Sequence, residues 1–410
     1  MKWSWVGWVA WVLITGFIAL SLYVDSHQLN PASSFNPDLF HIKNVSLIGY
    51  SHNKPTWRIT TPFVRVKHSN LWELKSVKNG RAWDQSGNLV LSQLTASHLN
   101  LMVNDRQLMA NERVSFVLQQ EQASSLPIVF YANFLSLLEA TQEATLQNKV
   151  HIVQGNLHIW PTHEVKIDLD KRTLRSSQGC YLSSPAMRVT GNECLWDFHT
   201  ATLTVSGDVR LIRRAEKRCA PTMDSREKKI RSKDLFITCS TLSFDHTKDR
   251  SSQKASGKLV IFQKGSIFKS DFGYHDPRLN TYTLLKNVRV QTNSLSFLLK
   301  NPKSFRNKTL KACFSSPIHI TCDLLIFDLK NHIFSLKGSV KIIQKNHTIT
   351  CEKVFLNDDS HLLSFIGNVF VKETSGQLFE ASELRYNLLT EDMSANNRIH
   401  TLIKINRKKS

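Results

Sequence analysis

Apolar and polar residues alternate along much of the C-terminal half of the chain. In residues 337–342, alternation places Gly338, Val340 and Ile342 on one face and lysine or serine side chains on the other. Residues 207–211 repeat this arrangement with different side chains. A period of two is typical of a β-strand with one buried face, because successive side chains point to opposite faces of a sheet. These segments therefore predict strands.

The alternating segments belong to a repeated unit. Residues 320–342 and 349–371 both begin with Ile-Thr-Cys and both end on Gly-x-Val-x-Ile or Gly-x-Val-x-Val, with a spacing of 29 residues. Looser copies start at Val189, Ile237, Phe268 and Phe379. In the copy that starts at Phe268, Lys286 stands where the other copies carry glycine. A single hairpin cannot bury its apolar face, so the repeat predicts a stack of hairpins with a shared core.

The N-terminal half also has the alternation of strands, for example in residues 57–59 and 99–103. Two segments depart from it. Residues 132–147 carry leucine, alanine and glutamate at spacings that predict a short helix. Residues 213–233 are strongly basic, contain Pro221 and lack periodicity, so they predict an exposed loop or hinge.

The first residues of the chain predict a membrane anchor. Residues 3–24 form an uncharged apolar run whose first half contains four tryptophans. A helix of this length spans about 33 Å, which matches a hydrocarbon core of about 30 Å. A cleaved signal peptide is the alternative, but its apolar region is usually only about 7–15 residues long and ends at a small-residue site. The best such site here, Ala19-Leu20-Ser21, is poor, so we expect an uncleaved single-pass anchor.

Charge narrows the possible partners. The chain has 53 Lys and Arg against 33 Asp and Glu, a formal net charge of +20. This balance favours an anionic partner such as a nucleic acid, an anionic membrane surface or a phosphorylated ligand. A nucleic-acid partner requires a cytoplasmic domain, which the predicted anchor disfavours, so we expect no nucleic acid.

Motifs of catalysis and metal binding are missing from the sequence. The seven cysteines include no C-x-x-C pair, which argues against a zinc site and favours buried thiols. The sequence has no G-x-S-x-G, H-E-x-x-H or P-loop motif. We therefore expect no catalytic site, no metal and no cofactor, and predict that the protein is not an enzyme.

Two parts of the sequence resemble known families. Phe40-x-Ile42-x-Asn44-Val45-x-Leu47-x-Gly49, followed by Trp57-x-Ile59, resembles the periplasmic lipopolysaccharide-transport protein LptC. The later units, with Ile-Thr-Cys-x-x-Leu-x-Phe-Asp and then Gly-x-Val-x-Ile, resemble the OstA-like domain of LptA. The resemblance implies an all-β fold after the transmembrane helix. It would be a β-jellyroll, a folded-over sheet open along one edge, in two consecutive modules.

The expected organisation has five parts. They are the anchor (1–24), an LptC-like region (25–212), a basic loop or hinge (213–235), LptA-like repeats (236–400) and a basic tail (401–410). The resemblance implies a protein of the bacterial inner membrane with most of its chain in the periplasm. It would accept lipopolysaccharide from an inner-membrane ABC transporter and pass it, with other transport proteins, towards the outer membrane.

Candidate site residues follow from this expectation. The inward aliphatic residues are core positions that could also line an acyl-chain groove: Val209, Leu211, Leu259, Ile261, Val288, Val290, Val340, Ile342, Val369 and Val371. Basic residues of the predicted loop could contact anionic head groups or simply be solvated: Arg226, Lys228, Lys229 and Arg231. The alternative function is a membrane-anchored structural or adhesive β-solenoid. A tightly filled core would favour the solenoid, and an open apolar slot would favour lipid transfer.

The anchor is open to a direct test. We expect residues 3–24 to remain attached in the mature protein, because the apolar run is long and the cleavage site is poor. Edman sequencing of protein extracted from membranes should therefore begin at or near the initiator methionine. A mature N-terminus near Leu22 or Asp25 would show that the segment is a cleaved signal peptide.

Overall fold

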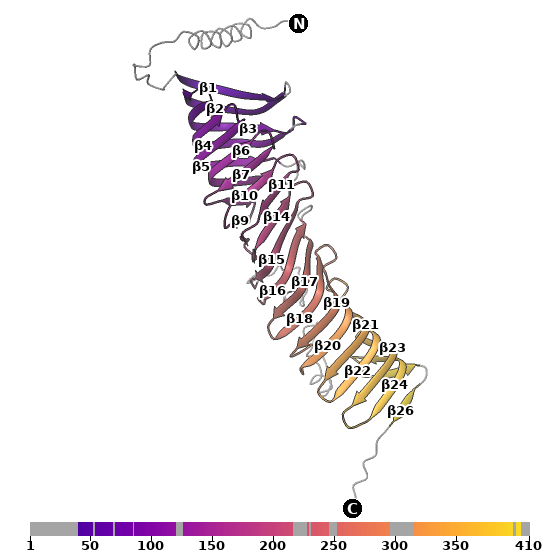
Figure 1. Cartoon of the computed structure of the whole chain (residues 1–410). Coiled ribbons are helices and arrows are strands. Elements are labelled where there is room, and N and C mark those ends of the chain that lie inside the picture. The colour runs from indigo at the N-terminus through magenta and orange to yellow at the C-terminus, as the bar shows by residue number, and fades with distance from the viewer. Residues whose placement is uncertain are drawn as a thin grey trace, which may run out of the picture.

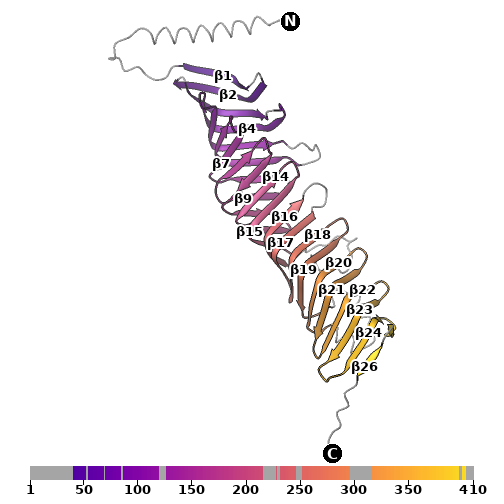
Figure 2. The same ribbon diagram turned by 45° about the vertical axis from the view of Figure 1, so that its right-hand side comes forward.

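The computed structural model describes residues 40–51, 54–68, 70–84, 86–119, 126–215, 228, 231–245, 252–295, 315–396 and 399–402. These residues form a single antiparallel sheet of 26 strands. Figure 1 shows the sheet as a long, twisted stack that runs from β1 at one end to β26 at the other, and Figure 2 shows the same continuity after a 45° turn. The all-β prediction is confirmed for these residues.

The strands follow one another closely along the chain. They are β1 (Phe40–Ser51), β2 (Lys54–His68), β3 (Leu71–Trp83), β4 (Leu89–Met102), β5 (Gln107–Leu118), β6 (Ile128–Leu138), β7 (Glu143–Gln147), β8 (His151–Gln154), β9 (Leu157–Pro161), β10 (Val165–Asp168), β11 (Thr173–Ser176), β12 (Cys180–Ser183), β13 (Met187–Gly191), β14 (Glu193–Asp197), β15 (Thr202–Arg213), β16 (Leu235–Asp245), β17 (Ser252–Gln263), β18 (Ser266–Asp276), β19 (Thr281–Thr292), β20 (Ile318–Asp328), β21 (Ile333–Gln344), β22 (His347–Asn357), β23 (Leu362–Glu373), β24 (Leu378–Asn387), β25 (Met393–Asn396) and β26 (His400–Leu402).

Each long strand bends near its middle and thereby contributes to two walls. In β20, Ile318, Ile320 and Cys322 are buried before the bend and Leu325 and Phe327 after it, so the inward phase shifts by one residue. The pairing register shifts at the same place in β20–β21 and β21–β22. A bulge that sets two residues against one bends its strand in this way. Both halves of the strand therefore face the same interior.

The recurring glycine lies at this bend, which we call the corner. Gly338 and Ser339 have φ angles of 75° and 43°, and Lys286 and Asn287 take the same left-handed conformation with 61° and 52°. Glycine adopts this conformation without steric cost. Close packing also favours glycine at this position, because a Cβ at Gly338 would lie 2.9 Å from the Cβ of Asp323. The 29-residue repeat is therefore the spacing between the glycine-bearing corners of every second strand, such as β21 and β23.

The two walls are continuous along the stack. Wall A includes residues 209–213 of β15 and 318–322 of β20, and wall B includes residues 202–206 and 324–328 of the same strands. Between β6 and β15 the walls are built from separate short strands, β8, β9, β12 and β13 in wall A and β7, β10, β11 and β14 in wall B.

The interior between the walls, which we call the trough, runs past the predicted hinge without a break. Pairing of β15 with β16 joins residues 202–213 to residues 235–245. Each wall is a succession of the six strands β1–β6, four short strands, the ten strands β15–β24 and one terminal strand. At about 4.8 Å between neighbouring strands, 21 strands extend over roughly 95 Å.

The trough is filled in its N-terminal part and less tightly closed beyond β15. Leu118 and Ile128 lie at the edge opposite the corner, yet they are only 2% and 0% exposed. From β16 onward, residues near the corner such as Val340 remain buried, whereas Ile261 and Val371, farther from the corner, are half-buried. The free edge is therefore less covered at β17 and β23, whereas Ile318 at the same edge in β20 is only 4% exposed.

The predicted helix over residues 132–147 is wrong. The segment contains the end of β6, a turn and β7, and its side chains pair across the sheet. Inward residues alternate up to Ala132 and resume at Leu135 because the corner lies between them. The corner thus creates a spacing of three residues inside a strand, and this spacing resembles the periodicity of a helix.

Five of the seven cysteines lie in the described part of the chain. Cys180, Cys194, Cys239, Cys322 and Cys351 are all buried with free thiols. Burial raises the pKa of Cys239 to about 11 and that of Cys322 to about 12. The thiols of Cys239 and Cys322 therefore stay protonated and act as small apolar groups beside the corner.

Substitution of a corner glycine tests the role of the bend. Gly338→Ala should lower the free energy of unfolding by about 2–3 kcal/mol, because left-handed strain and the contact with Asp323 both oppose a Cβ. Gly87→Ala is the control: Gly87 has a φ of 88°, but a Cβ added there would meet nothing within 4 Å, so the expected loss is about 1 kcal/mol. Equal losses in urea denaturation would contradict close packing at the corner.

Candidate functional site

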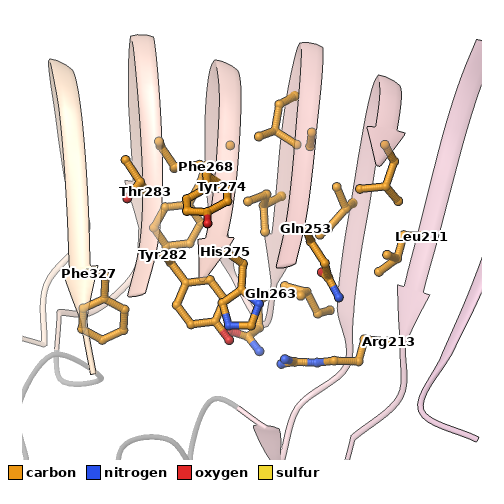
Figure 3. A pocket seen from close by; sticks show the side chains of 18 of the residues that line it. Leu211, Arg213, Gln253, Gln263, Phe268, Tyr274, His275, Tyr282, Thr283 and Phe327 are labelled. Carbon is orange, nitrogen blue, oxygen red and sulfur yellow. The ribbon is translucent and has the colours of Figure 1, made fainter. Parts of the chain in front are cut away.

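A partly open pocket of about 320 Å³ lies between the walls where they begin to part. Figure 3 shows its side chains projecting from neighbouring strands into a common space. The lining residues are Ala186, Met187, Leu211, Arg213, Arg231, Leu235, Ile237, Leu242, Gln253, Ala255, Leu259, Ile261, Gln263, Phe268, Gly273, Tyr274, His275, Tyr282, Thr283, Leu284, Leu325, Phe327 and Phe334. Most are apolar and, apart from Ala186 and Arg231, they come from β13 and from β15 to β21.

Two small residues of wall B account for the space. Leu242, Ala255, Gly273 and Leu284 lie opposite one another on successive strands β16 to β19. All four face inward, so two leucines flank an alanine and a glycine. The missing side-chain volume on β17 and β18 leaves a hollow, into which Leu259 of wall A projects close to Gly273.

The free edge of the pocket is polar. On wall A, the inward row of β15 ends in Arg213 and that of β17 ends in Gln263, each after aliphatic residues. On wall B, Gln253, His275 and Tyr282 lie at the ends of their strands, and Figure 3 shows them close to the side of the pocket reached by Arg213. The pocket therefore has an apolar interior and a polar edge.

The charged side chains among the described residues of this edge are cationic. The described lining residues include two arginines and neither aspartate nor glutamate. Burial lowers the pKa of His275 to about 4, and the positive charges of Arg231 and Arg213 contribute to this lowering, against an opposing effect of Asp276. At neutral pH His275 is therefore uncharged. Its ring stacks on Tyr282 with centroids 4.3 Å apart, and its buried Nε2 atom has no hydrogen-bond partner among the described residues.

Three of the ten predicted groove residues line this pocket, namely Leu211, Leu259 and Ile261. The other seven do not: Val209, Val288, Val290, Val340, Ile342 and Val369 are buried, and Val371 is half-buried. Their alternation correctly placed them inward. Proximity to the corner explains why Val209, Val340 and Val369 are packed as core.

Of the four basic residues predicted to contact head groups, the structure describes two, and one of these lines the pocket. Arg231 lines the pocket, whereas Lys228 is half-buried and does not. Arg226 and Lys229 lie outside the described residues. The segment that joins β15 to β16 thus brings at least one cation to the pocket edge.

Several pocket residues were not chosen as site residues from the sequence. Arg213 was assigned to the basic loop, although it ends β15 and continues the inward row of Val209 and Leu211 by one more alternation. Gln263 continues the row of Leu259 and Ile261 in the same way. His275 and Tyr282 carried no comparable signal, because they reach the pocket from the opposite wall and no sequence spacing specifies which strands face each other.

At the filled end of the trough, two side-chain contacts join the free edges of the walls. Thr56 at the edge of wall A donates a hydrogen bond to Glu139 at the edge of wall B, 3.1 Å away. Arg172 of wall B contacts Asp84 of wall A at 3.4 Å, and both side chains are only 11% exposed. These four residues, which we call the edge latch, hold the trough shut along its N-terminal part.

The described part of the chain contains no group of three or more His, Cys, Asp and Glu side chains that could hold a metal ion. Nor does it include a helix of sufficient length and apolarity to cross a bilayer. The predicted anchor, residues 1–24, lies outside the described residues, so it stays a prediction.

No family model matches the sequence, and no curated protein matches it. Among solved structures, the chain is similar to LptH, the LptA homologous periplasmic component of the conserved lipopolysaccharide transport device from Pseudomonas aeruginosa. The two are 11% identical with a TM-score of 0.22, over 42% of this chain and 95% of LptH. A likeness at this level carries no information on function, which has to be inferred from the site.

The edge latch predicts a pH-dependent stability. Burial raises the pKa of Asp84, but hydrogen bonds from Asn88 and Arg172 and the charge of Arg172 outweigh it, so the pKa lies below its ordinary value. The stabilisation is therefore present above about pH 4, the ordinary carboxyl range, and is lost as pH falls through the lowered pKa. Arg172→Gln should reduce the free energy of unfolding by about 1–3 kcal/mol at pH 7, and the reduction should shrink as pH falls through the lowered pKa of Asp84.

The neighbouring residue provides the control for this variant. Lys171 forms an exposed ion pair with Asp168 at 2.7 Å. Lys171→Gln removes the same charge one position away, and no measurable loss is expected because exposed pairs contribute little. Equal effects of the two substitutions in urea denaturation would show that the latch does not stabilise the fold.

Proposed function

We propose that this protein is a membrane-anchored lipid carrier that holds the acyl chains of lipopolysaccharide in the trough and passes the lipid from the inner towards the outer membrane. The observation that carries the proposal is the apolar pocket between the walls, with its cationic free edge. An amphiphile with acyl chains and an anionic head group is complementary to both parts. Acyl chains gain about 0.8 kcal/mol for each CH₂ removed from water.

The size and position of the pocket suit such a ligand. Its volume of about 320 Å³ lies at the lower end of the roughly 300–1,000 Å³ found in small-molecule sites. Beyond the pocket, half-buried inward residues continue along the trough at Ile349, Leu363, Val371 and Phe379. These side chains provide further apolar surface over which an acyl chain could move from strand to strand.

The resemblance to LptC and to the OstA-like domain of LptA supports the same role. Its first motif coincides with β1 and the start of β2, and its later motifs coincide with the strands around the corners. The proposed partners are an inner-membrane ABC transporter, which would supply the energy, and further lipopolysaccharide-transport proteins. The proposed location is the periplasmic face of the inner membrane. Carriage of lipid requires no catalytic residue in this chain.

A structural or adhesive solenoid is the second candidate function. The buried inward residues of β4 to β15 and the edge latch favour it for the N-terminal part. The pocket favours the carrier for the C-terminal part. The two candidates therefore differ most clearly in whether lipid enters between β15 and β20.

Photo-crosslinking from adjacent positions distinguishes the two functions. A photo-reactive residue at Ile261 faces the pocket and should crosslink to lipopolysaccharide, whereas one at Phe262 faces outward and should not. Phe262 is the stricter control because its apolar side chain is 43% exposed. The readout is an electrophoretic shift detected with an antibody to lipopolysaccharide. Equal labelling at both positions would indicate non-specific adsorption and would remove the support for a carrier.

Filling the pocket provides an independent check. Ala255→Phe adds a ring to the hollow beside Gly273 and should reduce crosslinking from Ile261 several-fold. The pocket offers room for the ring, so the variant should keep the thermal unfolding midpoint of the parent protein within a few degrees. A stable, filled variant that labels as strongly as the parent would place the lipid elsewhere.

A further inference from the structure

Three nitrogen-bearing side chains from different segments meet at the free edge of the pocket. Arg213 ends β15, Arg231 precedes β16 and His275 lies near the end of β18, and all three line the pocket. Figure 3 shows the Arg213 side chain extended along this edge towards Gln263 and His275. The loop between β15 and β16 is therefore attached where the pocket opens.

One carboxylate acts on His275 among the described residues, and it is already hydrogen-bonded. Among the described residues, the carboxylate that acts on His275 is that of its neighbour Asp276. Asp276 accepts hydrogen bonds from the backbone N–H groups of Arg278 and Leu279, at 2.9 and 3.3 Å. The ring that stacks on His275 is that of Tyr282. The edge is thus a positively charged site next to a low-dielectric interior.

We propose, building on the carrier function, that this edge is a subsite for a phosphate ester of the bound lipid, and that His275 takes up a proton when the phosphate binds. Arginine guanidinium groups bind phosphate through paired, charge-assisted hydrogen bonds. A phosphomonoester carries a charge of about −1.5 to −2 at pH 7, which matches two arginines. A protonated His275 would donate from Nε2 to a phosphate oxygen and thereby satisfy a buried atom that has no hydrogen-bond partner among the described residues.

The geometry also sets the orientation of the lipid. With its phosphate at the free edge, an acyl chain would extend between the walls towards Leu259 and Leu284, which line the apolar part of the pocket. The sugars would remain in solvent. A fatty acid would place only a single negative charge at an edge that carries two arginines. We therefore assign a phosphorylated acyl lipid to the site.

Proton uptake follows from the charges. Without ligand, burial and the two arginines keep the pKa of His275 at about 4. A bound phosphate would offset the arginine charges and add a negative charge within hydrogen-bond distance. An opposite charge this close changes a pKa by roughly one to three pH units. His275 should therefore add to the affinity for the phosphorylated lipid increasingly as pH falls from about 7 towards 5, because its ring binds more protons in the bound state than in the free state. This contribution opposes the loss of phosphate charge over the same range, since the second pKa of a phosphomonoester is about 6.

The first experiment compares lipids that differ only in phosphate. Purified full-length protein in detergent is titrated with lipopolysaccharide and with the same material after enzymatic dephosphorylation. We expect the phosphorylated form to bind about tenfold or more tightly. Arg213→Gln and Arg231→Gln should each remove about tenfold from that affinity and leave the dephosphorylated form unchanged. Arg210→Gln, an exposed outward position of the same strand, should have no effect.

The second experiment observes the proton directly in the unmodified protein. The pKa of His275 is measured by NMR with ¹³C-labelled histidine, and His275→Gln assigns the resonance. Lipopolysaccharide should raise this pKa by roughly one to three pH units, and dephosphorylated lipopolysaccharide should not. In His275→Gln, the part of the pH dependence of binding that exceeds the titration of the phosphate itself should disappear.

The outcomes separate the subsite from the carrier function. Equal affinity for both lipids, with an unchanged His275, would overturn the subsite and leave the carrier function standing. An equal rise of the His275 pKa with inorganic phosphate at the same concentration would overturn the assignment to a lipid phosphate. Absence of binding by either lipid would overturn both proposals.

Discussion

The bend at the corner is the constraint on which the rest of the structure depends. Two consecutive residues in the left-handed conformation, as at Gly338 and Ser339 of β21, form a bulge opposite the one-residue phase shift of the neighbouring strand β20 and turn the second half of the strand back over its first. Without this bend each hairpin would be flat and one apolar face would stay in water. With it, every long strand supplies both walls, and the core is a slot between them instead of a layer against another element.

A slot has two sides, and only the corner side is closed by the chain itself. At the free edges, side chains either close the slot or leave it open, and both arrangements occur along this protein. Over its N-terminal part, large inward residues and the latch between Asp84 and Arg172 close the edge. At β17 and β18, Ala255 and Gly273 are too small to fill the space, and a pocket results. The same fold thus provides both a rigid, filled stack and a site with room for a ligand.

Charge at the free edge changes what the pocket can hold. A purely apolar slot would accept any hydrocarbon, whereas Arg213 and Arg231 add a preference for an anion next to it. Their effect is strong because the interior screens charge poorly, as the lowered pKa of His275 indicates. The connection between β15 and β16 contributes to this charge, because it brings Arg231 to the edge.

Local sequence determined the all-β fold, the repeat and the inward residues, because alternation and glycine spacing are properties of neighbouring positions. It misled at residues 132–147, where the corner imposes a helix-like spacing on a strand. Local sequence also made Val340 and Val369 candidates for the acyl-chain groove, because both alternate inward, but they are packed beside the corner. Tertiary structure alone decided where the walls part and that His275 faces Arg213. These depend on which strands face each other across the slot, and contacts between opposite walls leave no period in the chain.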